Sequence, residues 1–277
     1  MNGALTQYAL EQAINFLLNT EAVTRPTSWY LAWHIGPPGD DGAANEQTTG
    51  GDANYARQPI TYGSSTWVSA AESRVSLNTN SINIVPAAAT SYTIYGFSIW
   101  DSLSGGNCLI AVDSLSALAV SDTFPRNFVA GDFPVQLGGL NAGWTSYGSG
   151  LLLDWLLTGD AITRPTAWWA ALHLGDPGDD GEANEVQAGD DPDYARQLIT
   201  FAAAASIAGS ITYTKNDIAA IWVPGDGANF TATHLTIKDA VTAGNTLYSM
   251  PFIPEMDGID SQSLAVAINK VTVIGSY

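Results

Sequence analysis

An ungapped internal repeat constrains this chain more than any other feature of its sequence. Residues 22–62 and 161–201 are identical at 25 of 41 positions and lie 139 residues apart in a chain of 277. Two tiles of that length fill the chain almost without remainder, which indicates a tandem domain duplication rather than a short solenoid repeat. We therefore expect one domain over residues 1–139 and a second over 140–277, joined within the glycine-rich stretch 137–150.

The later part of each tile repeats with an offset that is one residue shorter. Asp101 and Leu109 align with Asp239 and Leu247, whereas the earlier part keeps the offset of 139. We therefore expect one net deletion in the second tile, at a place that corresponds to residues 62–101 of the first.

A helical pattern opens each tile. Apolar residues recur there at three- and four-residue spacing, which is the periodicity of one helix face. They are Leu10, Ile14, Leu17 and Leu18 in the first tile and Leu151, Leu152, Trp155 and Leu156 in the second. A "TRPT" motif follows each pattern and ends the helix, because proline cannot continue it.

The rest of each tile reads as strands. Short runs rich in β-branched and aromatic residues alternate with Gly, Asn and Asp. A parallel α/β sheet would need a helix after each strand, and the sequence offers none. It therefore predicts a mainly β chain of two tandem antiparallel β-sandwich, jelly-roll-like domains, each with one N-terminal α-helix.

The charge balance narrows the classes of partner. Lys and Arg total 9 against 27 Asp and Glu, for a net charge of −18, while 46% of the residues are hydrophobic. The apolar fraction is high enough to build a core, so the chain is not a disordered acidic tail. Nucleic acid and anionic membranes would repel this charge, and we expect neither as a partner.

Cysteine content and the start of the chain bear on the compartment. The single cysteine, Cys108, excludes a disulfide within the chain and a cysteine metal site, and leaves open whether it is buried or paired between chains. The start "MNGALTQYAL" has no basic segment followed by an apolar run, and no stretch of 18 apolar residues occurs. We expect a protein that is made and used without Sec export, in the cytoplasm.

The repeated acidic loop around "PGDDG" is the first candidate site. In its second copy Asp179, Asp180, Asn184 and Glu185 offer the oxygen ligands that calcium prefers, but without the spacing of the helix–loop–helix calcium motif. Proline, aspartate and glycine in this order also favour a tight turn by themselves. We expect a turn, keep calcium as the alternative, and assign no metal ligand or cofactor.

His34 and His173 occupy matching strand positions, and His234 is the remaining histidine. A zinc site needs at least three protein ligands, which this set supplies poorly. We expect each of the two repeated histidines to hydrogen-bond a neighbouring loop from its strand.

Four of the nine basic residues recur with the repeat: Arg57 and Arg196 in "YARQ", Arg25 and Arg164 in "TRPT". In so acidic a chain we expect each to pair with a carboxylate. A bidentate bond from one of them to Asp40-Asp41 or Asp179-Asp180 would pin the acidic loop to the sheet. The alternative is a contact to a partner protein.

Enzymatic signatures do not emerge from the sequence. We find no Gly-x-Ser-x-Gly, no phosphate-cradling glycine loop and no Cys–His arrangement. A pair of carboxylates for sugar hydrolysis would need a buried acid, whereas these acids lie in solvated loops. Nine Trp and eleven Tyr could line a sugar-binding face, but strand aromatics are more simply core. We assign no catalytic residue and expect a non-enzymatic protein.

The repeated motifs carry a family resemblance over nearly the whole chain. They are "LLNTEAVTRPTSWYLAWH", "PGDDGAANE", "YARQPITY", "GFSIWDSLSGGNCL" and "SDTFPRNFVAGDFPVQL", with second copies such as "LLTGDAITRPTAWWAALH", "DPGDDGEANE" and "YARQLITF". This set resembles small virion proteins of tailed bacteriophages, of the tail-fibre, minor structural or capsid-decoration type. The resemblance implies a β-sandwich without catalytic residues; the duplication departs from the usual single copy.

Two classes of function follow as expectations. The first is a virion structural protein, most favourably a capsid decoration or cement component on the outer particle surface, with a tail-fibre or collar module as the close alternative. Its partners would be the major capsid protein or tail and collar proteins, in a homo-oligomeric arrangement within a virion assembled in the host cytoplasm. The second class is a carbohydrate-binding module for host adhesion, with calcium as a possible aid.

Overall fold

A computed structural model describes residues 4–68, 73–138, 143–207 and 211–276, and the structural statements below concern these residues. The first half contains β1 (Ala4–Leu5), α1 (Gln7–Leu18), β2 (Tyr30–His34), β3 (Gln58–Pro59), β4 (Thr66–Val68), β5 (Ser73–Ser76), β6 (Ile82–Ile84), β7 (Ser91–Trp100), β8 (Cys108–Ser121), β9 (Arg126–Phe128) and β10 (Val135–Gly138). The second contains α2 (Ser146–Leu157), β11 (Trp168–His173), β12 (Gln197–Ile199), β13 (Ala205–Ile207), β14 (Ile211–Lys215), β15 (Ala220–Trp222), β16 (Asn229–Lys238), β17 (Thr246–Ile259), β18 (Leu264–Val266) and β19 (Thr272–Ser276).

The two halves repeat one arrangement of sheets. Each has a main sheet, in the order β1-β8-β7-β2-β3 or β12-β11-β16-β17, a three-stranded sheet, β10-β5-β4 or β13-β14-β19, and a two-stranded ribbon, β6-β9 or β15-β18. Every pairing among the described strands is antiparallel. The prediction of a mainly β chain with two similar tandem halves and one N-terminal helix in each is confirmed.

Strand register locates the single-residue deletion. Thr66 pairs with Val75 in the first half, and Ala205 pairs with Tyr213 in the second. The offset between halves is therefore 139 on the first strand of each pair and 138 on the second. The deletion lies between β4 and β5, in the stretch 69–72 outside the described residues. The expected junction at 139/140 also lies outside them, so that boundary stays a prediction.

A threonine begins each helix in the same way. Thr6 and Thr145 accept hydrogen bonds from the backbone N–H groups of Ala9 and Gly148, at 3.3 and 3.1 Å. Each hydroxyl also donates to a carbonyl at the start of a long strand, Cys108 O in the first half and Thr246 O in the second. The cap satisfies an orphan helix donor and fixes the helix against its main sheet.

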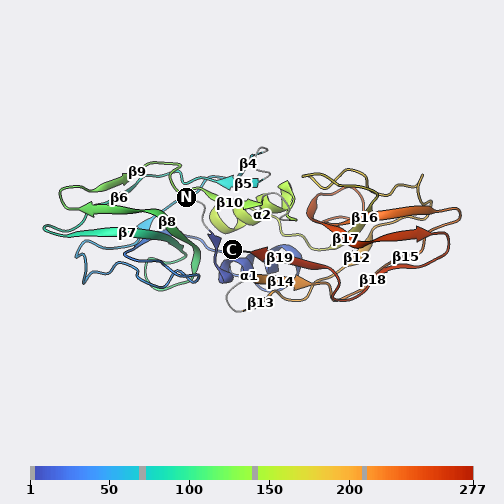
Figure 1. Cartoon of the computed structure of the whole chain (residues 1–277), viewed down its shortest axis with the longest axis horizontal. Coiled ribbons are helices and arrows are strands. Elements are labelled where there is room, and N and C mark those ends of the chain that lie inside the picture. The colour runs from blue at the N-terminus through green and yellow to red at the C-terminus, as the bar shows by residue number, and fades with distance from the viewer. Residues whose placement is uncertain (1–3, 69–72, 139–142, 208–210, 277) are drawn as a thin grey trace.

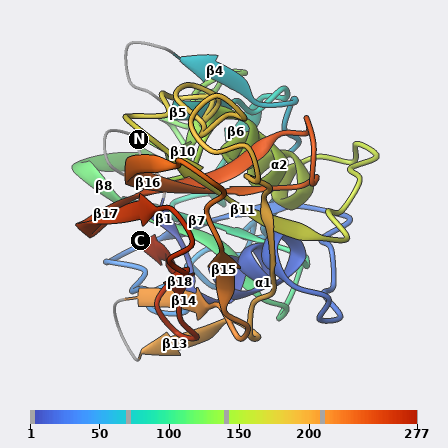
Figure 2. The same cartoon turned by 90° about the vertical axis from the view of Figure 1, so that its right-hand side faces the viewer.

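The helices cross between the halves. α1 packs on β13 and β14 of the second half, and α2 packs on β4, β5 and β10 of the first. The molecule is elongated, with a main sheet at each end and both helices in the middle, between the two three-stranded sheets (Figure 1 and Figure 2). The predicted apolar face of α1 is buried, and most of the buried apolar residues of both halves form one continuous cluster. Each fully buried aliphatic side chain stabilises the fold by about 1.5–3 kcal/mol.

The arginine of each "TRPT" motif binds the C-terminal end of the helix in the other half. The prediction that these arginines pair with carboxylates was wrong. Arg25 donates to the carbonyls of Asp154, Trp155 and Thr158 at the end of α2, at 3.1, 2.9 and 2.9 Å. Arg164 does the same at the end of α1. A guanidinium suits this place because the last four carbonyls of a helix lack intrahelical donors and carry its negative dipole end.

Candidate functional site

The two acidic loops are turns, as the sequence predicted. Gly39 and Gly42 have φ values of 75° and 69°, and the equivalent glycines of the second loop have 75° and 72°. These values lie in the left-handed region that glycine adopts without strain. Asp41 closes a side-chain turn by accepting the N–H of Ala43 at 2.9 Å, and Asp180 accepts that of Glu182 at 3.1 Å.

Each repeated histidine holds its loop to the strand, which confirms the prediction that these histidines hydrogen-bond a neighbouring loop. His34 Nδ1 lies 2.7 Å from Ala44 O in the loop, and its Nε2 lies 2.7 Å from Ser98 Oγ on β7. His173 makes the equivalent contacts, at 2.7 Å to Ala183 O and 2.9 Å to Thr236 Oγ1. Burial lowers the pKa of both imidazoles, because the charged form loses its hydration.

A bidentate arginine pins each loop, but through a glutamate. Arg57 donates from Nε and Nη2 to Glu46 at 2.8 Å each, and from Nη1 to the carbonyls of Ser102 and Gly105. The prediction of a bidentate bond to Asp40-Asp41 was therefore wrong in its partner. Glu46 stands beside His34 in an isolated β-bridge, which brings its carboxylate to the strand while the aspartates stay at the turn.

The second half has the same bidentate ion pair: Arg196 donates from Nε and Nη2 to the two carboxylate oxygens of Glu185, at 2.7 and 2.8 Å. The predicted partner in this half, Asp179-Asp180, was also wrong. Both side chains are about nine-tenths buried. Burial alone would raise the pKa of Glu185, but the hydrogen bonds and charge of Arg196 outweigh it and hold the pKa below its ordinary value. The arrangement is a charge-assisted structural clamp.

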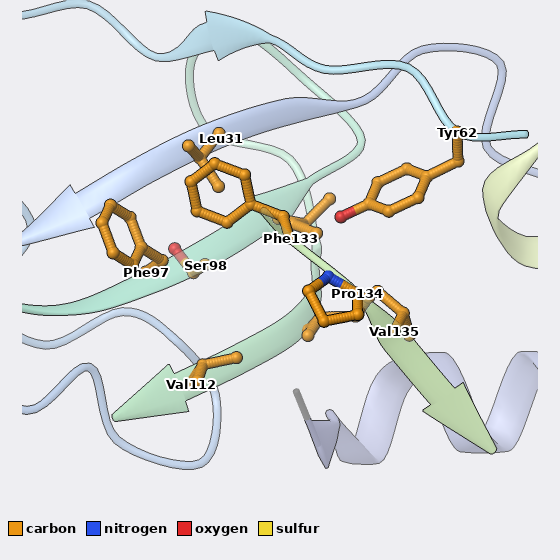
Figure 3. A pocket seen from close by; sticks show the side chains of 10 residues that line it. Leu31, Tyr62, Phe97, Ser98, Val112, Phe133, Pro134 and Val135 are labelled. Atoms are coloured by element: carbon orange, nitrogen blue, oxygen red, sulfur yellow. The ribbon is translucent and has the colours of Figure 1, made fainter. Parts of the chain in front are cut away.

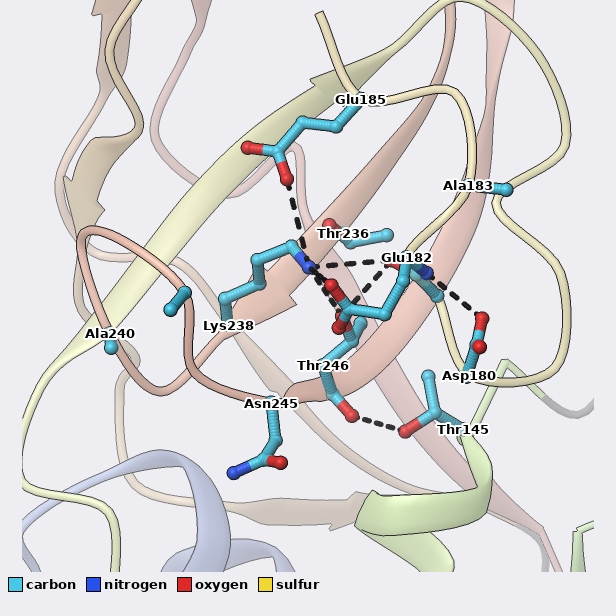
Figure 4. A network of polar contacts seen from close by, with 12 residues as sticks. Thr145, Asp180, Glu182, Ala183, Glu185, Thr236, Lys238, Ala240, Asn245 and Thr246 are labelled. Carbon is cyan, nitrogen blue, oxygen red and sulfur yellow. Dashed lines mark hydrogen bonds and ion pairs between the residues drawn. The ribbon is translucent and has the colours of Figure 1, made fainter.

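The two clamps differ in what surrounds them. In the second half Lys238 is fully buried, and its Nζ donates to Glu182 and Thr246 at 2.8 Å each, 3.7 Å from Glu185 (Figure 4). The repeat offsets align these three positions with Trp100, Ala43 and Cys108 of the first half. An ionic network in one half thus replaces an apolar group in the other.

In the first half Arg57 stacks on the Trp100 ring, 3.8 Å from its centroid. Cys108 is free and buried, and burial raises the pKa of its thiol to about 12. A thiol with that pKa stays protonated at neutral pH and is a poor nucleophile. The expected alternative of a cysteine paired between chains finds no support in this burial.

Three of the four residues considered as calcium ligands have structural roles instead. Glu185 binds Arg196, Asn184 donates to the carbonyl of Asp176 at 2.8 Å, and Asp180 closes the turn. Among the described residues, no group of three or more His, Cys, Asp or Glu side chains is placed to hold a metal ion.

A family comparison accounts for the repeat. A family model described as "Podophage GP4 fiber I protein gp80" matches residues 4–136 and again residues 143–274. The chain belongs to this family. Because each match covers one tile, the family unit is a single tile and this chain carries two. The predicted resemblance to tailed-phage virion proteins is confirmed. No curated protein matches the chain.

Membership in the gp80 fibre family makes the chain a phage virion structural protein. The ionisable residues of the two loops fit that class. The arginines and glutamates of both clamps bind one another, and each histidine contacts a loop carbonyl and a strand hydroxyl. In the part of the chain that the structure describes, no helix is long and apolar enough to cross a membrane.

Sequence reasoning missed Lys238 and its partner Glu182. The signal was present in the repeat, because a lysine that aligns with Trp100 occupies a position that the first half buries. At the two other aligned positions, Thr246 likewise replaces Cys108 and Glu182 replaces Ala43. Such a coordinated polar replacement at three aligned positions indicates a buried network.

A small apolar cavity in the first half is lined in part by Tyr62, whose buried hydroxyl has no hydrogen-bond partner among the described protein groups. The volume of the cavity is about 20 Å³, and the Tyr62 hydroxyl points toward Phe133 and Pro134 at its edge (Figure 3). Burial raises the pKa of Tyr62, so the hydroxyl stays neutral. The second half has Phe201 at the aligned position.

Proposed function

We propose that the protein is a non-enzymatic tail-fibre or collar component of a podophage-type virion. The observation that carries this proposal is the match of one fibre family to both halves of the chain. The family description supports the tail-fibre alternative better than the capsid-decoration role that the sequence favoured. Its partners would be tail or collar proteins and further copies of itself, assembled in the host cytoplasm.

Two features of the molecule support a structural role without turnover. The clamps use their ionisable groups for loop attachment: Arg57 binds both oxygens of the Glu46 carboxylate, and Ser98 Oγ hydrogen-bonds Nε2 of His34. The elongated shape places one β lobe at each end of a helical middle layer (Figure 1). We also propose the boundary of the two domains at residues 139/140.

Labelling of purified virions tests the location. Antibodies against the isolated protein, detected by gold in electron micrographs of the phage that encodes it, should decorate the tail or collar. Label spread over the capsid would instead support the decoration role. Antibody absorbed beforehand with the purified protein provides the control for non-specific label.

A carbohydrate-binding role has one observation in its favour. An open crevice of about 470 Å³ lies beside the first clamp, and Tyr55 and Leu103 contribute to its wall. Leu103 is 53% exposed, which leaves apolar surface for a sugar ring. Titration of the protein with the surface polysaccharide of the host, with Tyr55→Ala as a comparison, tests this role by the change in tryptophan fluorescence.

A further inference from the structure

Equivalent residues of the two halves meet at the centre of the molecule. Phe16 and Trp155 are separated by the repeat offset of 139, so they occupy the same position in their tiles. Their rings stack with centroids 4.7 Å apart and planes 17° apart. In a symmetric assembly, a residue contacts its own counterpart where the twofold axis passes through the interface.

The contacts around this pair are reciprocal. Asn15 Oδ1 accepts the N–H of Ala204 at 2.7 Å, and its counterpart Asp154 Oδ1 accepts the N–H of Ser65 at 2.6 Å. Here residue i of the first tile binds residue j of the second, and residue j of the first binds residue i of the second. This reciprocity defines an isologous interface between two copies of one unit.

Two further pairs of contacts obey the same rule. Trp29 Nε1 donates to Leu156 O at 2.8 Å, and Trp168 Nε1 donates to Leu17 O at 2.7 Å. The arginines repeat the pattern: Arg25 Nε bonds Trp155 O at 2.9 Å, and Arg164 Nε bonds Phe16 O at 3.0 Å. Each helix therefore has its terminal carbonyls bonded by the other tile.

The apolar contacts follow the same crossing. Leu17 and Leu18 of α1 and Leu156 and Leu157 of α2 are at most 1% exposed, within a cluster that continues through both halves. Because α1 packs on β13 and β14, a separated first tile would expose apolar helix surface and leave the α1 carbonyls without their arginine. Each tile therefore covers the apolar surface of the other tile's helix and binds that helix's last carbonyls.

We propose that this central layer is a subunit interface carried within one chain, and that its partner is a second copy of the same family unit. The chain is then a fused twofold pseudo-dimer. The interface holds the tiles together by its own contacts, and the covalent link at 139–142 is dispensable for their association. This inference does not depend on where the protein sits in the virion.

Cleavage of the full chain tests the proposal. A recognition site for a sequence-specific protease is inserted within 139–142, the purified protein is cut, and denaturing electrophoresis verifies complete cleavage. Size-exclusion chromatography with light scattering should then give one species with the mass of the uncut chain, 29.1 kDa plus the insertion. Elution as two separate fragments of about half that mass at micromolar concentration would overturn the proposal.

The crossing arginines give a second, graded readout. In the cleaved protein, Arg25→Ala with Arg164→Ala should raise the dissociation constant of the two fragments at least tenfold. The control removes the same charge without touching the interface, through Arg126→Ala with Lys270→Ala, and should change the constant less than twofold. Circular dichroism of the uncut variants verifies that each still folds. Equal dissociation constants in both double variants would overturn the assignment of the interface.

Discussion

Arg196 and Glu185 lie eleven residues apart and form a bidentate ion pair, with Nε–Oε1 at 2.7 Å and Nη2–Oε2 at 2.8 Å. Both side chains are about nine-tenths buried, and Arg196 Nη1 also bonds the carbonyl of Ala240 on the adjoining turn. One guanidinium thus joins the acidic loop to the end of β16. Its removal leaves a buried carboxylate without its main partner.

We therefore expect Arg196→Ala to lower the free energy of unfolding by about 3–5 kcal/mol, the range for breaking one side of a buried pair. Urea denaturation followed by tryptophan fluorescence measures the change. Arg126→Ala serves as the matched control, because this arginine lies on the surface and bonds a carbonyl of its own hairpin. A loss below 1 kcal/mol for Arg196→Ala would show that the pair does not pin the loop.

The Lys238 network yields a prediction about coupling. Lys238→Met removes a fully buried cation, but Glu182 is 44% exposed and regains water, so we expect a loss of about 1–3 kcal/mol. Glu182→Ala alone should also destabilise, because Lys238 then keeps one charged neighbour fewer. The double variant should lose less than the sum of the single losses, by about 0.5–3 kcal/mol. A double-mutant cycle in urea measures this term, and strict additivity would contradict the network.

Periodicity and turn chemistry carried the prediction of the fold. The spacing of Leu10, Ile14 and Leu17 predicts α1, and the "PGDDG" motif predicts the turn in each acidic loop, where its glycines have positive φ. The sequence could not identify the partner of Arg57, because the loop contains three acids, Asp40, Asp41 and Glu46, at similar distances along the chain. Only the β-bridge between His34 and Glu46 selects the right one.

The crossing of the helices could not be predicted from the sequence for a different reason. The tiles are so similar that the sequence cannot distinguish a contact within one tile from the same contact between tiles. Arg164 could in principle bond the end of α2 or the end of α1, since both helices end in equivalent residues. The choice depends on chain geometry at the centre, where Phe16 meets Trp155.

The repeat provides its own control for the Tyr62 hydroxyl. Tyr62→Phe removes a buried donor without a partner and keeps the ring, so we expect a gain of about 1 kcal/mol in the free energy of unfolding. Phe201→Tyr, the reverse change at the aligned position, should destabilise the second half by about 1–3 kcal/mol. Thermal unfolding of both variants in parallel measures the difference. A loss of stability in Tyr62→Phe would mean that the hydroxyl has a favourable partner.

The buried histidines make stability depend on pH with a defined sign. Burial lowers the pKa of His34 and His173 below the ordinary value of 6.5, so the unfolded chain binds more protons than the folded chain just below pH 6.5. Their neutral forms therefore support the fold fully above about pH 6.5, and this support is lost as the pH falls.

Acidification also reduces the repulsion within a chain of net charge −18, which acts in the opposite direction. The histidine effect is therefore measured as a difference from His34→Gln with His173→Gln, which keeps a polar side chain but does not titrate. Urea midpoints between pH 7.5 and about 5.5 should show the wild-type protein losing stability relative to this variant as the pH falls. A constant difference over that range would mean that the two imidazoles take up protons equally in the folded and unfolded chain.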